Sequence, residues 1–303
     1  ARLNNWYPAT VPGTVHTDLM ANRIIEDPYF RLNERGVQWV DKEDWIYETH
    51  FEADAGLLAR ERIELVFEGL DTYADVYLND EKVLAADNMF RRWRTEVKRL
   101  LRPGENTLKV YFHSPIKVDL PKYDSLPYRY EAVNDQSANG GLFDKRVSVF
   151  ARKAGYHYGW DWGPRLPDAG LFREASVLAV KTARLTQVFV GQEHHVTGKT
   201  VHGNVVDSVR LTADAEIEWM PGVTNGNVKI VMTVTSPDGK TVLTAESGTM
   251  DPLTNSAPAK NLTGLTCDLR SNHVQASLTV ENPELWWPNG YGAQALYQVK
   301  VAL

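Results

Sequence analysis

The sequence predicts an all-β protein that contains two consecutive β-sandwich domains. Runs of alternating apolar and polar residues, which are typical of half-buried strands, occur along most of its 303 residues. Helical patterns are few. Near residues 180–184 the pattern of the strand-like runs changes, and we place the domain boundary there. A chain of this length is long enough for about two domains. We therefore expect one domain at residues 1–181 and a second at residues 182–303.

The first domain is expected to be the larger one, with most of its strands before residue 116. Strand-like runs cover residues 45–53, 62–70, 73–84 and 106–115. The run 73–84 reads as two strands joined at Asn79 and Asp80, because both residue types tolerate the positive φ of a tight turn. Thr14 and Thr17 are possible N-caps of a short helix, since apolar residues at helical spacing follow them.

Residues 116–170 break this strand rhythm. Loops of this length are usually functional or disordered, and the density of aromatic residues argues against disorder. The stretch 152–170, RKAGYHYGWDWGPRLPDAG, is too polar for a core strand and too rich in glycine and proline for a helix interior. Its aromatic side chains favour a functional loop. We therefore expect this stretch to contact a ligand.

The second domain shows a plainer pattern of short alternating strands with turn signals such as SPDGK between them. The runs are RLTQVFVGQEHH, SVRLTADAEIEWM, NVKIVMTVTSPDGKTVLTAES, HVQASLTVENPELWWP and ALYQVKVAL. Strands at this spacing predict an immunoglobulin-like sandwich. The cysteine–tryptophan–cysteine signature of antibody domains is absent, because Cys267 is the only cysteine, so the likeness concerns architecture alone.

Composition and charge argue against several kinds of partner. The formal net charge is −6, whereas a nucleic-acid site needs a basic excess on one face. No apolar run approaches the roughly 20 residues that span a bilayer. Cys267 has no partner at metal-ligand spacing, and the adjacent His194 and His195 point to opposite faces of a strand. We therefore expect no nucleic-acid partner, no membrane span, no metal and no cofactor.

Several motifs taken together resemble glycoside hydrolase family 2, in the order and spacing of that family and along almost the whole chain. They are WYPATVPGTVHTDLMANRIIEDPYF, VQWVDKEDWIYETHF, FEGLDTYADVYLND, NTLKVYFHSP, RKAGYHYGWDWGPRL and NPELWWPNGYGAQALY. The segment His16-Thr17-Asp18 with DPYF, and above all GWDWGP, resembles the β-mannosidase branch. A lone WDWG would be a weak signal. The ordered set of long motifs is a specific one.

The resemblance implies a jelly-roll β-sandwich, similar to galactose-binding domains, followed by an immunoglobulin-like β-sandwich. It also implies a third domain, a (β/α)8 barrel that carries the two carboxylates of a retaining hydrolase at its strand ends. No alternating βα segment occurs in this sequence. We therefore expect no catalytic residue here and no activity of the chain alone. The sequence starts in mid-pattern at Ala1, so the first strand of the jelly roll is expected to be missing.

Trp160 and Asp161 are the predicted substrate-binding residues. In β-mannosidases, which this chain resembles, the loop reaches the barrel and contacts the terminal sugar. A carboxylate can accept charge-assisted hydrogen bonds from two hydroxyls, and an indole offers a flat apolar wall with one N–H donor. The alternative is that Asp161 pairs with Arg165 or Arg152, while Trp160 packs the loop onto its own domain.

The predicted loop-supporting residues are Arg152, His157, Trp162, Gly163 and Pro164. Arg152 and Lys153 are expected to hold the loop through salt bridges, with plain surface solvation as the alternative. His157, between two tyrosines, reads as a structural hydrogen-bond donor. Trp162, Gly163 and Pro164 are expected to shape the turn, because glycine allows unusual φ and proline fixes the exit.

The resemblance predicts the N-terminal part of a β-mannosidase that removes terminal non-reducing β-D-mannose residues. The expected partners are a β-mannoside oligosaccharide and the barrel of the same polypeptide. Two alternatives stay open. One is a free-standing carbohydrate-binding module, and the other is part of a β-galactosidase- or β-glucuronidase-type relative, against which GWDWGP argues. The compartment stays open too: periplasmic or secreted in a bacterium, lysosomal in an animal.

Overall fold

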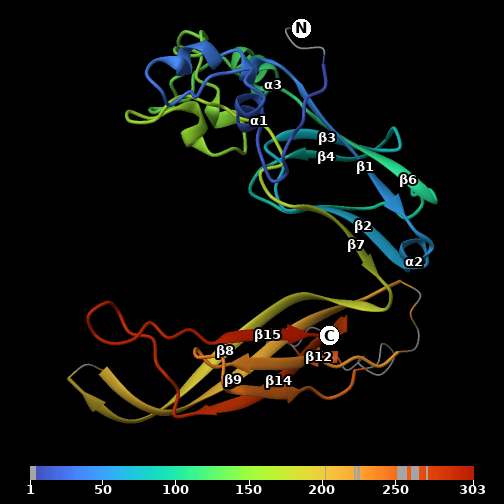
Figure 1. The fold of residues 1–303 in the computed structure, drawn as a ribbon, viewed down its shortest axis with the longest axis vertical. Helices are drawn as coiled ribbons and strands as arrows, with labels where there is room; N and C mark the ends of the chain where they lie inside the picture. The colour runs from blue at the N-terminus through green and yellow to red at the C-terminus, as the bar shows by residue number, and fades with distance from the viewer. Residues whose placement is uncertain are drawn as a thin grey trace. The chain divides into compact units, whose positions relative to one another are not determined.

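Strands dominate the computed structural model, which describes residues 5–303 except residues 202, 222, 224, 225, 251–257, 261–265 and 271. The prediction of an all-β protein is therefore confirmed. The chain forms two compact units, Ala1–Ala179 and Val180–Leu303 (Figure 1). Within the described residues, no helix is long and apolar enough to cross a membrane.

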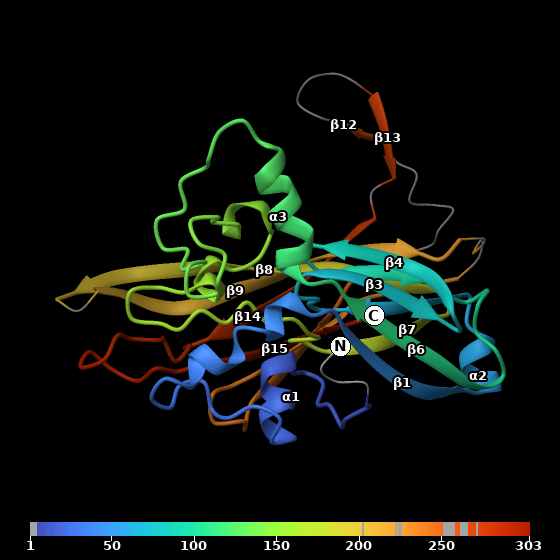
Figure 2. The ribbon, with the colours of Figure 1, turned by 90° about the horizontal axis from the view of Figure 1, so that it is seen from above.

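The first unit is a sandwich of two sheets that enclose one core. One sheet has the order β1 (Trp45–Ala53), β6 (Gly104–Phe112), β3 (Tyr73–Leu78) and β4 (Glu81–Asp87), and Figure 2 shows these strands side by side. The other sheet has the order β5 (Trp93–Glu96), β2 (Arg62–Phe67) and β7 (Ala175–Val180). Because side chains alternate along a strand, every second residue faces the other sheet. Phe67, Leu78 and Phe112 meet in this core and are almost fully buried.

Several predicted elements of the first unit are confirmed. β1 coincides with the predicted strand 45–53. The turn between β3 and β4 contains Asn79 at φ 50° and Asp80 at φ 68°, the conformation for which these residues were expected. The predicted helix is α1 (Val15–Ala21), and the N–H of Thr14 donates to Oγ1 of Thr17 at its start. At these positions the local sequence is sufficient to predict the secondary structure.

The inserted segment 116–170 is more regular than expected. It begins with α3 (Pro115–Ser125), which the sequence did not predict because Pro121 lies inside it. Ser114 caps this helix by accepting a hydrogen bond from the N–H of Lys117, and a proline in the first turn is well tolerated. The segment also contains η3 (Ser148–Phe150) and η4 (Gly155–Tyr158), and the remaining short helices are α2 (Ala55–Leu58), η1 (Asn33–Val37) and η2 (Val40–Lys42).

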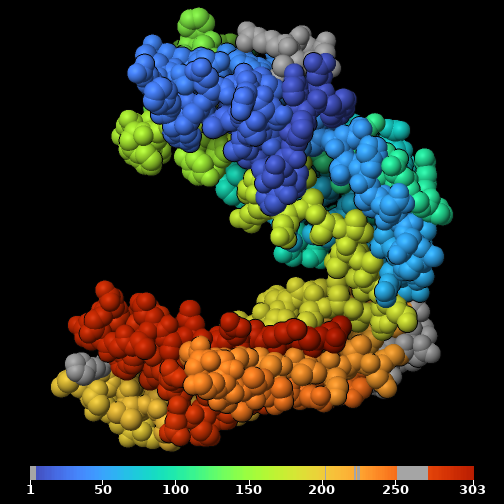
Figure 3. Space-filling model, in the orientation of Figure 1, coloured from blue at the N-terminus to red at the C-terminus, as the bar shows by residue number. Residues whose placement is uncertain are grey.

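The second unit is also a sandwich. One sheet has the order β14 (His273–Glu281), β9 (Gly203–Trp219) and β8 (Ala183–Thr200), and the other has the order β11 (Val242–Glu246), β10 (Val231–Thr235) and β15 (Gln298–Ala302). β12 (Pro258–Lys260) pairs with β13 (Thr266–Arg270). Ile217, Ile230 and Met232 are fully buried between the sheets. In Figure 3 the segment before β15, in red, lies against the β8–β9 hairpin, in gold.

Candidate functional site

A tight turn at residues 160–163 forms the tip of the loop that carries Trp160 and Asp161. The N–H of Trp160 donates to the carbonyl of Gly163 at 3.1 Å, and the N–H of Gly163 donates back at 3.3 Å. Trp160 and Trp162 are 37% and 84% exposed, and their ring centroids lie 6.3 Å apart. Asp161 is exposed, and its carboxylate makes no hydrogen bond or ion pair within the described part of the chain. The turn therefore presents a free carboxylate flanked by two indoles.

A glycine and a glutamine shape the entry to this turn. Gly159 has a φ of 97°, in the region that favours glycine, and a Cβ there would lie 2.9 Å from Cδ of Gln136. The side-chain amide of Gln136 donates to the carbonyl of Trp160, and its backbone N–H donates to the carbonyl of Tyr158 at 2.8 Å. Neither residue was identified from the sequence, because Gln136 lies 24 residues before Trp160.

A buried ion pair fixes the base of the loop. The ammonium of Lys153 lies 2.5 Å from Oδ2 of Asp71 and donates to the carbonyl of Asp168 at 2.7 Å. The side chains of Lys153 and Asp71 are 0% and 2% exposed. The backbone of Asp71 exchanges two hydrogen bonds of 3.0 Å with Gly170. Both ends of the loop are thus held at Asp71, between β2 and β3.

His157 and Asp168 connect the loop to α1. The N–H of Asp168 donates to Nδ1 of His157 at 3.4 Å, so this nitrogen accepts and the neutral ring carries its proton on Nε2. Burial, followed by the charge of Lys153, lowers the pKa of His157 to about 4. Nδ1 of His16 lies 2.8 Å from the Asp168 carboxylate. Burial alone would raise the pKa of Asp168, but hydrogen bonds, led by that from His16, hold it below its ordinary value.

The two arginines weighed as partners of Asp161 pair with other carboxylates. Nη2 of the buried Arg165 lies 2.7 Å from Oδ2 of Asp41. Nη1 of the exposed Arg152 lies 2.8 Å from Oδ2 of Asp87. Neither arginine therefore holds Asp161. Because exposed ion pairs contribute little, Arg165 is the stronger anchor of the loop, and Arg152, which was predicted for this role, is the weaker one.

The other predicted loop-supporting residues lie in different surroundings. Trp162 is largely exposed, and its ring lies against that of Trp160 on the same turn. A Cβ on Gly163 would lie 3.8 Å from Cβ of Trp160, which is an ordinary contact. Pro164 is half-buried and leads into the buried Arg165. His157 supports the backbone, but its Nδ1 acts as an acceptor where the sequence suggested a donor.

His194 and His195, the adjacent histidines of the second unit, lie in β8. In the described residues, no group of three or more His, Cys, Asp or Glu side chains is placed to hold a metal ion. Nδ1 of His195 lies 2.7 Å from Oδ1 of Asp207, and both side chains are exposed.

Comparison with protein families finds two matches along the chain. The family described as "Glycosyl hydrolase 2 galactose-binding domain-like" matches residues 1–173. The family described as "Glycosyl hydrolases family 2" matches residues 194–303. These matches agree with the predicted order of a galactose-binding-like sandwich followed by an immunoglobulin-like one.

Curated proteins similar to this chain are fungal enzymes named β-mannosidase B. The protein from Emericella nidulans is 33% identical over 299 residues, which are 97% of this chain and 30% of the relative. The protein from Neosartorya fischeri is 35% identical over 306 residues, covering 98% of this chain and 31% of the relative. The chain thus spans about 30% of the length of these relatives.

Solved structures extend the similarity. A β-D-mannosidase from Dictyoglomus thermophilum superposes with a TM-score of 0.72 at 32% identity, over 99% of this chain and 32% of that chain. An exo-chitosanase from Amycolatopsis orientalis superposes with a TM-score of 0.59 at 18% identity, over 94% of this chain and 27% of that chain. The second likeness concerns the fold alone.

Proposed function

Because the chain belongs to glycosyl hydrolase family 2, we propose that it forms the N-terminal, non-catalytic domains of a retaining β-mannosidase. The proposed parent protein hydrolyses terminal non-reducing β-D-mannose residues. The observation that carries this proposal is the identity of 32–35%, along nearly the whole chain, to proteins named β-mannosidase. The proposed domains are residues 1–181 and residues 182–303.

The catalytic groups are proposed to lie elsewhere in the parent. A retaining mechanism needs two carboxyl groups about 5–5.5 Å apart, one as nucleophile and one as acid/base. Asp161 is a single exposed carboxylate, whereas Asp71 and Asp168 are engaged by Lys153 and His16 at the base of the loop. We place the catalytic pair on a (β/α)8 barrel, so the chain alone is inactive.

The proposed substrate contact is the turn at residues 160–163. The two oxygens of Asp161 can accept charge-assisted hydrogen bonds from neighbouring sugar hydroxyls. Trp160 adds an apolar face and an indole N–H donor. A turn on a fixed base loses little freedom when it binds, and the pairs Lys153–Asp71 and Arg165–Asp41 fix this base.

Exposed apolar side chains beside the turn support a contact with a further domain. Tyr156 is 67% exposed and Trp162 is 84% exposed. Phe90, at 68% exposure, lies on the loop that is joined to this stretch by the bridge between Asn88 and Arg152. Soluble proteins rarely leave large apolar patches uncovered. We propose that the barrel of the parent covers these side chains, so that the sugar is held between the barrel and the turn.

The test is hydrolysis of an aryl β-mannoside by the full-length parent. Asp161→Asn keeps the size of the side chain but removes its charge, and we expect kcat/KM to fall at least about 100-fold, the loss of charge-assisted bonds to the sugar. Glu81→Gln is the matched control, since Glu81 is an exposed carboxylate in β4. An unchanged kcat/KM for Asp161→Asn would remove this residue from the substrate site, and turnover by the 303-residue chain would refute its proposed inactivity.

A second candidate function is a free-standing carbohydrate-binding module. The exposed pair Trp160 and Trp162 favours it, because flat aromatic faces stack on sugars. Calorimetry of the 303-residue chain with mannobiose and mannan distinguishes the two functions. Tight binding would favour the module, and absence of binding would favour a subsite completed by the barrel. A panel of aryl glycosides on the parent tests the β-galactosidase- and β-glucuronidase-type alternatives.

A further inference from the structure

A surface turn in the second unit contains the pair Asn289 and Gly290. The N–H of Tyr291 donates to the carbonyl of Pro288 at 3.0 Å, which closes the turn around this pair. Gly290 has a φ of 86°, and a residue with positive φ at this position of a four-residue turn is usually glycine. The geometry of the turn therefore explains why a glycine follows the asparagine.

Both residues of the pair are open to solvent. Asn289 and Gly290 are exposed, and among the described residues nothing beyond the chain neighbours would lie within 4 Å of a Cβ on Gly290. Within the described part of the chain, neither the side-chain amide of Asn289 nor the N–H of Gly290 makes a hydrogen bond. Because glycine has no Cβ, its nitrogen is also the least obstructed of any residue. This nitrogen and the side-chain carbonyl carbon of Asn289 can therefore approach each other.

We propose that Asn289 is a site of spontaneous modification, in which the backbone nitrogen of Gly290 attacks the side-chain carbonyl carbon of Asn289. The nitrogen gives up its proton, a new C–N bond closes a five-membered succinimide ring, and the bond to the side-chain nitrogen breaks as ammonia leaves. Water then opens the ring at either of its two carbonyls. One opening gives aspartate, and the other gives isoaspartate, in which the main chain runs through the former side chain.

Another asparagine–glycine pair, in the first unit, has different surroundings. Asn139 is exposed, like Asn289, but its amide donates to Oε1 of Gln136 at 3.0 Å. Gly140 is buried, and its N–H donates to the carbonyl of Ser137 at 3.0 Å. A nitrogen whose proton is held by a carbonyl is a poorer nucleophile, and to move it would break a buried hydrogen bond. We therefore expect the fold to protect Asn139.

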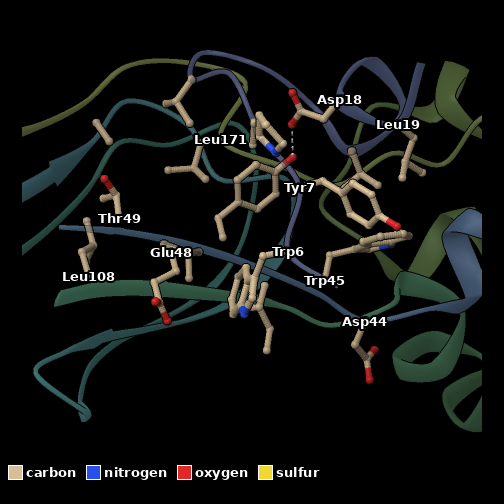
Figure 4. Close-up of a pocket in the computed structure, with 18 of the residues that line it drawn as sticks. Trp6, Tyr7, Asp18, Leu19, Asp44, Trp45, Glu48, Thr49, Leu108 and Leu171 are labelled. Carbon is tan, nitrogen blue, oxygen red and sulfur yellow. Dashed lines mark hydrogen bonds between the residues drawn. The ribbon is translucent and has the colours of Figure 1, made fainter. Parts of the chain in front are cut away.

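Open space beside an asparagine is not sufficient for the reaction. Asn22 lines a cavity of about 920 Å³ between β1 and β7 in the first unit, which Figure 4 shows. Its amide donates to the carbonyls of Pro8 and Asp18, both at 2.8 Å. The next residue, Arg23, has a side chain that obstructs ring closure. Asn289 has no such amide partner in the part of the chain that the structure describes, and glycine follows it.

The modification would also change the loop that the turn closes. The N–H of Trp287 donates to the carbonyl of Ala293 at 2.9 Å. The ring of Trp287 lies so close to Gly292 and Gly203 that an added Cβ would stand 2.7 Å and 3.2 Å from it. Isoaspartate adds a carbon atom to the main chain of the turn, together with a negative charge. We expect this change to loosen the contact of Trp287 with β9.

The test follows the 303-residue chain during incubation at mildly alkaline pH, because loss of the amide proton starts the reaction. Peptide mass spectrometry measures the conversion of each asparagine, and enzymatic methylation identifies isoaspartate. We expect Asn289 to convert at least about tenfold faster than Asn139, since Asn139 reacts only after local opening. Equal rates, or no conversion of Asn289, would overturn the proposal. Aspartate without isoaspartate would also overturn it, because direct hydrolysis of the amide gives aspartate alone.

Two controls separate the effect of the structure from that of the local sequence. In the urea-unfolded chain, Asn289 and Asn139 should convert at similar rates; a difference as large as in the folded chain would refute the structural argument. Asn289→Gln keeps an exposed amide in the turn but requires a less favourable six-membered ring, so conversion at this position should stop. Amide exchange at Trp287 should be faster in the isoaspartate form. Unchanged exchange there would refute the loosening of the loop.

Discussion

Lys153 allows a quantitative test of how the loop is held. Lys153→Met removes the ammonium but keeps a long apolar side chain, which leaves the carboxylate of Asp71 buried at 2% exposure without its cation. Loss of one partner of a buried pair costs about 3–5 kcal/mol. For a unit of 150–250 residues, Tm changes by about 2–4 °C per kcal/mol, so the transition of the first unit should fall by about 6–20 °C.

Scanning calorimetry of the whole chain measures this fall in Tm. Because two domains need not unfold together, the unfolding transition of each unit is assigned separately. Lys82→Met is the matched control, since Lys82 pairs with Asp75 at 2.7 Å while 47% exposed. This pair, whose lysine lies largely in solvent, should contribute less than about 1 kcal/mol.

A double variant separates loss of pairing from loss of packing. Replacing both partners of a buried ion pair by apolar residues is often nearly neutral. Lys153→Met combined with Asp71→Leu should therefore recover a large part of the lost Tm. A single Lys153→Met variant that loses no more than the Lys82→Met control would refute the view that this pair anchors the loop.

Three further predictions concern the same loop. His157 has a folded-state pKa of about 4, below its ordinary 6.5, so the unfolded chain binds more protons between these values. Stability should fall as pH drops through this window, by at most about 1.4 kcal/mol per pH unit, and His157→Gln should flatten the fall in urea titrations. Gly140→Ala would place a Cβ 2.5 Å from Cζ of Arg165 and should cost more than about 1 kcal/mol in urea unfolding, whereas at Gly36 nothing lies within 4 Å. Asp161→Asn should leave the urea midpoint unchanged, because the carboxylate is exposed.

The strands were predictable because their causes are local. In β6, buried residues alternate with half-buried ones, and in β1 the sequence pattern gives the strand bounds directly. The turn at Asn79 and Asp80 follows from the backbone preferences of those two residues. α3 was not predicted; it contains Pro121, and the Ser114 cap and the small core of Ile116, Val147 and Tyr158 stabilise it nonetheless. Local rules do not include such tertiary packing.

The buried partners of the loop's anchors could not be predicted for a different reason. Arg165 pairs with Asp41 across 124 residues of sequence, and Lys153 pairs with Asp71 across 82. Nothing in the local sequence distinguishes these buried partners from exposed charges such as Arg152. The exposed turn itself was easier to identify, because tryptophan, aspartate and glycine in such density are unusual in an idle loop.

The residues that anchor the loop are different from the residues that it exposes at its tip. The charges of Lys153 and Arg165 are buried with their partners, so substitution there disturbs folding and function together. Asp161 is exposed and buries little surface, so substitution there should change binding while the fold stays intact. A loop with a buried, ion-paired base and an exposed tip would suit the proposed subsite, because the geometry is then fixed before the sugar arrives.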